Sequence, residues 1–365
     1  MTTKAIPVKL LLGILVCSLP MTTAAGSTTS FGTRNRPVLL TDFGPHLFSN
    51  ESYSEFWTID SWLPDKSYIG LDIAITNIGV GDHKGGFKAR FVDPGGGKSE
   101  CKAEYDNDEW SYAKQGFSMK FGKNSIGGDL QKISVKVRCK KLEMDLVFTN
   151  QAPPVCPGSG ILKFGQGDGV YSMVFPCPRA HVTGTVKRAG KTVEVDGVSF
   201  AEHSYSDMAP YNQARRWFRF KHITGDISVI MAEVESTRDY GSAHNGWVLI
   251  SDNNGKIIAT TRARFDFEGF IKDKHSDEGY TIPRRVRIVA VDGDTSVIGT
   301  LTMTSLRKIE DPTASLGFLK RSIIRRFTKP RDYYINCKMQ MKIKKGDQEK
   351  TIDATGFYRY LHVNP

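Results

Sequence analysis

One short segment, residues 195–220, carries side chains that could do acid–base chemistry. Glu202 and His203 are neighbours, and Asp207 follows a few residues later. A histidine near a carboxylate can transfer a proton, because the carboxylate orients the ring and tunes its pKa. These three residues are therefore the candidate catalytic group if the protein is an enzyme.

The alternative is that the same histidine is structural. The segment alternates like a β-strand, and neighbouring residues of a strand point to opposite faces, so Glu202 and His203 should not contact each other. Ser204 and Ser206 lack the strained, glycine-flanked turn that a serine nucleophile needs. We favour a histidine that bonds to the backbone where one part of the chain joins the next.

Aromatic side chains form a second candidate site. Aromatic rings inside a β-barrel can line an apolar pocket for a hydrophobic ligand, although each ring could equally fill a core. The candidate ligand-binding residues are Trp57, Trp62, Trp110, His203, Trp217 and Phe220. The histidines and cysteines show no zinc-type spacing, so we expect neither a metal ion nor a cofactor.

The elements that must position these side chains are strands. Alternating apolar and polar residues recur roughly every ten residues, separated by Asp-Gly or Asn-Gly turns. This pattern predicts an all-β chain whose antiparallel strands close into barrels. The clearest predicted strands cover residues 68–76, 87–92, 133–139, 142–148, 193–200, 227–234, 247–250, 257–265 and 285–291.

One helix is predicted, over residues 311–329. Asp311 can cap it, Pro312 suits its first turn, and Pro330 ends it. One face is apolar, and basic residues that could contact an anionic membrane follow the other, namely Lys320, Arg321, Arg325 and Arg326. We favour the alternative, a helix packed against a barrel with a solvated outer face.

The first 25 residues have the layout of a secretory signal peptide. Lys4 and Lys9 precede an apolar run over residues 10–19, and small residues follow it. We expect cleavage and a location in the secretory pathway, the periplasm or outside the cell; the alternative is an uncleaved interfacial anchor. Such compartments permit disulfides. Cys101 and Cys139 could bridge neighbouring strands, and Cys156 and Cys177 could link the two sides of one hairpin. Cys337 is then left over, since cleavage removes Cys17.

The composition indicates a folded, basic protein. The chain has 365 residues, a length that is enough for two domains. Its formal net charge of +11 suits anionic partners such as lipid headgroups. Because no nucleic-acid-binding motif accompanies the charge, nucleic acid is not an expected partner. The oligomeric state is not indicated.

Several motifs point to a family. The spacing H-x4-M-x-P-x3-A-x2-W, from His203 to Trp217, resembles the signature of the survival-factor family of tandem lipocalin-like proteins. The run ASLGFLKRSIIRRFTKPRDYY, over residues 314–334, is similar to another part of that family. The wider superfamily includes carotenoid hydratases and pericyclases.

The resemblance implies two tandem lipocalin-like barrels, over residues 42–208 and 209–365. It also implies non-enzymatic binding and transfer of a ceramide-like or sphingolipid-like ligand, together with a link to survival under oxidative stress. As an alternative location, it implies the periphery of intracellular membranes. The alternative function is a hydratase or cyclase acting on a hydrophobic isoprenoid or polyketide, with His203 as the acid–base group.

Overall fold

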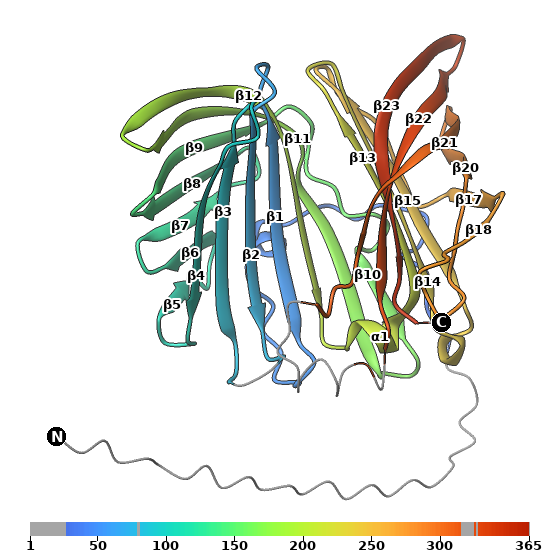
Figure 1. Cartoon of the computed structure of the whole chain (residues 1–365), viewed down its shortest axis with the longest axis horizontal. Coiled ribbons are helices and arrows are strands. Elements are labelled where there is room, and N and C mark those ends of the chain that lie inside the picture. The colour runs from blue at the N-terminus through green and yellow to red at the C-terminus, as the bar shows by residue number, and fades with distance from the viewer. Residues whose placement is uncertain (1–26, 79–80, 315–324, 326–327, 365) are drawn as a thin grey trace, which may run out of the picture.

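The computed structural model describes residues 27–78, 81–314, 325 and 328–364. The described chain is almost entirely β, as predicted, and forms two large antiparallel sheets that stand side by side (Figure 1). The chain passes from the first sheet to the second between Ser206 and Ala214. No helix in the described ranges is long and apolar enough to cross a membrane.

The first sheet has 12 strands in the order β4-β3-β2-β1-β12-β11-β9-β8-β7-β6-β5, with β10 paired to β11. Its strands are β1 (Ser54–Trp62), β2 (Tyr68–Thr76), β3 (Lys84–Val92), β4 (Lys98–Tyr105), β5 (Trp110–Tyr112), β6 (Phe117–Phe121), β7 (Asn124–Gly128), β8 (Lys132–Cys139), β9 (Leu142–Asn150), β10 (Ile161–Phe164), β11 (Gly169–Arg188) and β12 (Lys191–Ser206).

The second sheet has nine strands in the order β16-β15-β14-β13-β23-β22-β21-β20-β17. Its strands are β13 (Ala214–Ile223), β14 (Ile227–Ser236), β15 (His244–Asp252), β16 (Gly255–Thr260), β17 (Ala263–Glu268), β20 (Arg285–Asp292), β21 (Thr295–Glu310), β22 (Arg331–Lys345) and β23 (Gln348–His362). The small elements are β18 (Ile271–Lys272) paired with β19 (Thr281–Ile282), η1 (Leu40–Phe43), α1 (Pro210–Gln213) and η2 (Arg238–Tyr240).

Two predicted elements differ from the structure or fall outside it. The run predicted over residues 257–265 is two strands, β16 and β17, because the ladder ends at Thr260, whose hydroxyl donates to the carbonyl of Val291 at 2.8 Å, and residues 261–262 are not in a strand. The predicted helix over residues 311–329 lies mostly outside the described residues; the described residues 312–314 form a turn.

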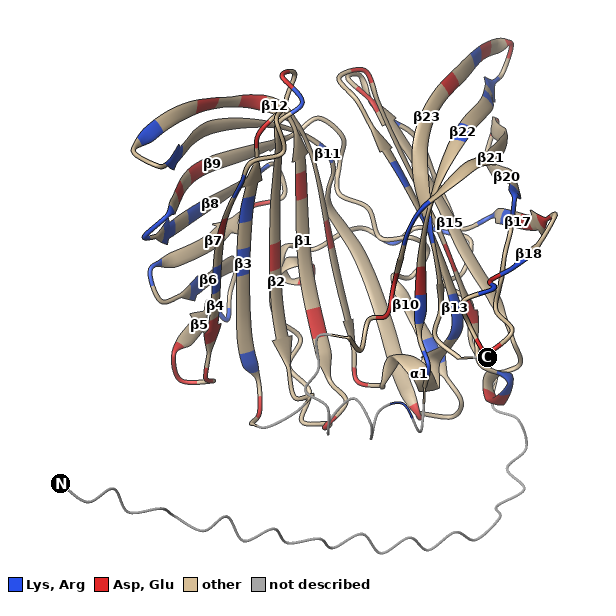
Figure 2. Ribbon diagram, in the orientation of Figure 1, with Lys and Arg blue, Asp and Glu red and all other residues tan. Residues whose placement is uncertain are grey.

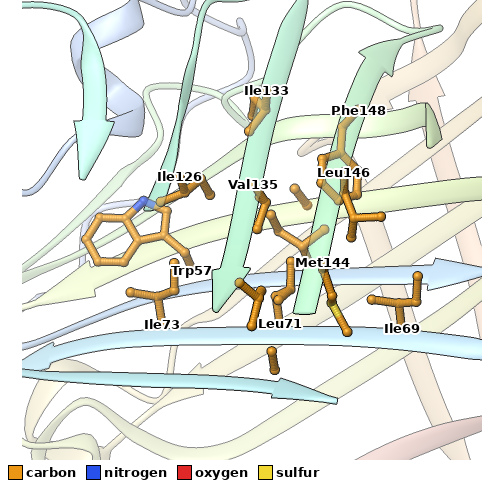
Figure 3. Close-up of a cluster of buried hydrophobic side chains, with 14 of the residues drawn as sticks. Trp57, Ile69, Leu71, Ile73, Ile126, Ile133, Val135, Met144, Leu146 and Phe148 are labelled. Atoms are coloured by element: carbon orange, nitrogen blue, oxygen red, sulfur yellow. The ribbon is translucent and has the colours of Figure 1, made fainter. Parts of the chain in front are cut away.

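Three hydrophobic cores follow from strand alternation. The inward face of the first sheet buries one cluster around Trp57, drawn in Figure 3, and the inward face of the second sheet buries another around Phe218. A third cluster lies between the sheets, where Tyr171, Phe200 and Trp247 are buried. Each sheet is thus the wall of its own barrel, and the two walls pack against each other.

The predicted disulfide Cys101–Cys139 is present. It does not join neighbouring strands as expected, because β4 ends the first sheet whereas β8 pairs with β7 and β9. The bond therefore links the end strand β4 to a strand near the other end of the same sheet. The loop that it closes spans 38 residues.

The pairing Cys156–Cys177 is wrong. Both cysteines are buried and free, as is Cys337. The bridge between Val155 and Phe175 is antiparallel, so Cys156 lies opposite Val174, three residues short of Cys177. The two thiols are therefore out of register, although both belong to the core of the first barrel.

A buried arginine joins the two barrels. Arg179, on β11, is 1 % exposed. Its guanidinium donates to the carbonyl of Thr224 at 3.0 Å, to the hydroxyl of Ser228 at 2.9 Å and to the side chain of Asn253 at 2.7 Å. All three acceptors belong to the second barrel, so this side chain fixes how the two walls meet.

Candidate functional site

Two adjoining hollows lie at the joint between the barrels. They measure about 450 Å³ and about 400 Å³, and both are lined by Phe56, Ser204 and Arg219. The first extends over the outer face of β2 to β4. The second lies beside the start of the second barrel and is also lined by Tyr171, Gln213, Trp217, Arg359 and Leu361. We call these two hollows together the joint cavity.

Strand alternation explains which side chains face the joint cavity. Along β12, Glu202 and Ser204 point outward, whereas His203 points into the first barrel. Along β13, Trp217 and Arg219 share the outward face, while Phe218 and Phe220 fill the second barrel. The predicted separation of Glu202 from His203 therefore has a direct cause in the period of two.

Charged groups in and beside the joint cavity pair with one another. Glu202 lies 3.4 Å from Arg219 and 3.3 Å from Lys221. Lys221 also reaches Asp60 at 3.4 Å, and Arg359 pairs with Asp332. Burial would raise the pKa of Glu202, but the charges of Lys221 and Arg219 outweigh it and lower that pKa. The charged residues that line the two hollows nearly balance, which favours a ligand without net charge; they are the cations Lys88, Lys102, Arg219 and Arg359 and the carboxylates Asp72, Glu104 and Glu202.

Tyr171 offers the joint cavity an unused polar group. Its ring meets Trp217 edge to face, with centroids 5.0 Å apart. Its hydroxyl is buried and makes no hydrogen bond of ordinary geometry among the described protein atoms, although Arg219 and Ser204 lie near enough to interact with it. Burial raises the pKa of Tyr171, so the hydroxyl keeps its proton and can donate. A ligand with a hydroxyl or amide oxygen could satisfy this group, whose burial without a partner is costly.

The six predicted ligand-binding residues do not come together. Trp217 lines the joint cavity, whereas Trp62 lines a separate hollow at another part of the joint. Trp57 and Trp110 are buried in the first barrel and donate to the carbonyls of Phe43 and His83, both at 2.8 Å. His203 is also in the first barrel, and Phe220 belongs to the core of the second.

The structure gives His203 two close partners, only one of which is backbone. Its Nδ1 lies 2.7 Å from the carbonyl oxygen of Asp42, and its Nε2 lies 2.7 Å from a carboxylate oxygen of Glu55. The side chain is fully buried, and it lines neither hollow of the joint cavity. Asp207 instead accepts from the backbone amide of Val170 at 2.7 Å. The predicted catalytic trio is therefore dispersed.

Most of the residues that line the joint cavity were not predicted from the sequence. Tyr171 and Arg359 come from strands far from Trp217 along the chain, and no local pattern connects them. The alternation of Arg-Arg-Trp-Phe-Arg-Phe could have placed Arg219 beside Trp217.

Of the basic residues predicted to contact a membrane, Lys320, Arg321 and Arg326 lie outside the described residues. Arg325 pairs with Asp311 at 2.7 Å.

Comparisons with known proteins identify similar sequences. A family model described as AttH-like matches residues 50–307. The chain is 26 % identical over 234 residues to "Ceramide-binding protein svf1" of Emericella nidulans, which covers 59 % of each protein. It is 25 % identical over 201 residues to "Ceramide-binding protein SVF1" of Candida albicans, which covers 51 % of each. The matched region thus spans little more than half the length of these relatives.

Solved structures with the same fold include an AttH protein from Nitrosomonas europaea, with a TM-score of 0.51 and 14 % identity, covering 88 % of this chain and 96 % of that one. CghA in complex with Sch210972 has a TM-score of 0.57 and 9 % identity, covering 86 % and 89 %. These likenesses confirm the lipocalin-like fold. The resemblance to the survival-factor family is confirmed by the two ceramide-binding relatives.

Proposed function

Because this chain belongs to the AttH-like family, we propose that it binds a hydrophobic lipid in the joint cavity and transfers it between membranes without chemical change. The observation that carries this proposal is the composition of the cavity wall. Phe56 and Trp217 supply apolar surface, and the buried hydroxyl of Tyr171 can donate to one polar end of a ligand. A few placed polar groups in an apolar hollow are typical of small-molecule sites.

The ligand class that fits best is a ceramide or a related neutral sphingolipid. Such a lipid carries hydroxyl and amide groups but no charge, and the charged side chains that line the joint cavity nearly balance one another. Hollows of about 400 and 450 Å³ suit a headgroup and the first part of each chain. The names of the two fungal relatives support the same class.

An acid–base enzyme has less support from the geometry. Among the predicted trio, only Glu202 lines the joint cavity. Lys221 and Arg219 lower its pKa, which keeps it ionised and makes it a weak proton acceptor near neutral pH. His203, the predicted acid–base group, faces the other side of β12.

Three further proposals accompany the lipid-binding function. One is a secretory location after removal of residues 1–25, and another is a link with survival under oxidative stress. The third is peripheral contact with anionic membranes through Lys320, Arg321, Arg325 and Arg326.

The direct test is lipid capture by the purified full chain. The protein is incubated with vesicles of phosphatidylcholine that contain a few per cent ceramide, re-isolated, and its bound lipid is extracted and identified by mass spectrometry. We expect ceramide enriched over phosphatidylcholine and close to one molecule per chain. Recovery of no lipid, or of lipids in the proportions of the vesicle, would contradict the proposal.

A further inference from the structure

Three side chains able to bind a metal ion meet inside the first barrel, away from the joint cavity. They are His46, which precedes β1, Glu55 on β1 and His203 on β12. One ligand atom from each lies within 4.8 Å of the others. Glu55 and His203 are fully buried, and the His46 side chain is 28 % exposed.

The hydrogen bond to Asp42 fixes the orientation of the His203 ring. The Nδ1 atom lies 2.7 Å from a backbone carbonyl oxygen, which can only accept, so Nδ1 carries a proton. In a neutral ring Nε2 then presents a lone pair, and it points at Oε1 of Glu55 from 2.7 Å. Two acceptors at this distance need either a proton or a metal ion between them.

Glu55 is held so that one oxygen faces both imidazoles. Its carboxylate accepts from the backbone amide of His46 at 3.1 and 2.9 Å, and its Oε2 also accepts from the hydroxyl of Tyr53. Oε1 lies 3.2 Å from Nδ1 of His46 and 2.7 Å from Nε2 of His203. The His46 ring is itself fixed by stacking on Tyr205, with centroids 4.3 Å apart.

We propose that His46, Glu55 and His203 form a binding site for one divalent metal ion of the zinc type. Two imidazoles and one carboxylate are a common zinc ligand set, and a carbonyl that receives the other ring N–H is the usual outer partner of such a histidine. The Asp42 carbonyl fills that outer position for His203. No local spacing of residues indicates the site, because His203 lies 148 residues from Glu55.

Two of the three distances between ligand atoms are close to those around a bound zinc ion, whereas the third, between the two histidine nitrogens, is bounded only at 4.8 Å and would have to be roughly 3.3 Å. Tetrahedral zinc with ligand bonds of about 2.0–2.1 Å holds its ligand atoms roughly 3.3 Å apart. The 3.2 Å between His46 Nδ1 and Glu55 Oε1 already matches this value. The 2.7 Å between His203 Nε2 and Glu55 Oε1 must open by roughly 0.6 Å to reach it.

The bound ion would fasten the segment that precedes β1 to the first barrel. This segment already inserts Phe43, whose ring is fully buried against Phe117. Trp57 donates to the carbonyl of Phe43, and His203 bonds to that of Asp42. A metal ion on His46 would add a third link, between the segment, β1 and β12. This inference does not depend on lipid binding.

The test measures binding of zinc alone to the full chain. Protein stripped with a chelator and dialysed is titrated with Zn²⁺, and retained metal is counted by elemental mass spectrometry; Co²⁺ is added in parallel to reveal histidine ligation by its visible absorption. We expect one ion per chain. His46→Gln should weaken binding at least tenfold, and because His46 is partly exposed this variant should still fold.

The matched control is His181→Gln, which removes an exposed histidine that pairs with Asp196. Its zinc affinity should equal that of the unchanged chain. The proposal is overturned if the unchanged chain retains no stoichiometric metal, or if His46→Gln and His181→Gln bind alike. It is also overturned if nitrogen NMR shows both ring nitrogens of His203 protonated in excess zinc, because a proton would then occupy the position assigned to the metal.

Discussion

Trp57 and His203 lie directly opposite each other on the paired strands β1 and β12, and their rings stack with centroids 4.4 Å apart. The stacking covers one face of the histidine with indole and places it in the core of the first barrel. The next residue along β12 in either direction must then face the other way. This is why Glu202 and Ser204 line the joint cavity whereas His203 does not. Charged residues in Figure 2 lie mainly on the outer strands and hairpins of both barrels.

Removing the indole at the joint cavity should weaken lipid binding. In Trp217→Ala the apolar wall beside Tyr171 is lost, and the burial of an aromatic ring is worth about 1.5–3 kcal/mol. We expect ceramide affinity, measured by displacement of a fluorescent ceramide, to fall at least tenfold. Trp62→Ala truncates a tryptophan in a different hollow and should change affinity less than twofold. Equal losses in the two variants would argue against the joint cavity.

The charge of Glu202 should set the preference for neutral lipids. Glu202→Gln leaves Arg219 and Lys221 with one carboxylate fewer, so an anionic headgroup is attracted more strongly. We expect the ratio of affinities for ceramide 1-phosphate and ceramide to rise about tenfold, which corresponds to about 1.4 kcal/mol. Glu143→Gln, which removes an exposed carboxylate paired with Lys187, is the control and should leave the ratio unchanged. A ratio that does not move in Glu202→Gln would show that these cations do not meet the headgroup.

The buried guanidinium of Arg179 should stabilise the contact between the barrels. Arg179→Met keeps the apolar stem but leaves the carbonyl of Thr224 and the side chain of Asn253 without their donor. Hydrogen bonds from a charged donor contribute about 1.5–3 kcal/mol, so we expect the free energy of unfolding to fall by about 3 kcal/mol. Guanidinium denaturation, with Lys187→Met on the same strand as the exposed control, measures the difference. Indistinguishable midpoints for the two variants would contradict this role.

His362 should make the protein less stable in mild acid. Burial, together with the charges of Arg215 and Arg216, lowers the pKa of His362 to about 4. Its Nε2 donates to the carbonyl of Thr281 at 2.9 Å, and the ring stacks on Tyr280. The unfolded chain takes up this proton near pH 6.5 whereas the folded chain does not, so stability is full above pH 6.5 and falls as the pH drops toward 4.

The expected loss from this one group is about 3 kcal/mol across that pH window. It is measured as the difference in pH dependence of unfolding between the unchanged chain and His362→Asn, because other titrating groups are common to both. The variant should be less stable at pH 7 but should lose less stability between pH 7 and pH 4. Parallel curves would mean that His362 titrates normally in the folded state.

Local patterns in the sequence predicted the fold well and the site poorly. Residues 68–76 are β2 with the same bounds, because apolar alternation and a turn after Thr76 define that strand locally. Alternation also separated Glu202 from His203 correctly. Barrel closure, by contrast, brings Tyr171, Trp217 and Arg359 together from three distant strands, and it brings Glu55 to His203 across 148 residues. Neither grouping can be predicted from the spacing of residues along the chain.

The cysteine pairings were likewise predicted only in part. Cys101 and Cys139 were paired correctly, but the reason expected, adjacent strands, was wrong, since their strands are linked only through the curvature of the first sheet. Cys156 and Cys177 sit in similar proline-flanked sequences and yet are out of register. This three-residue offset follows from the register of the bridge between Val155 and Phe175, which the sequence does not reveal.

The measurement that tests the central claim most directly is photo-crosslinking with a ceramide that carries a photoreactive group near its headgroup. The purified full chain is loaded from vesicles, irradiated and digested, and the labelled residues are mapped by mass spectrometry. Binding in the joint cavity predicts labels on Phe56, Tyr171 or Trp217 that an excess of unlabelled ceramide abolishes. Labels confined to the barrel interiors or the outer hairpins, or no label that unlabelled ceramide competes for, would contradict it.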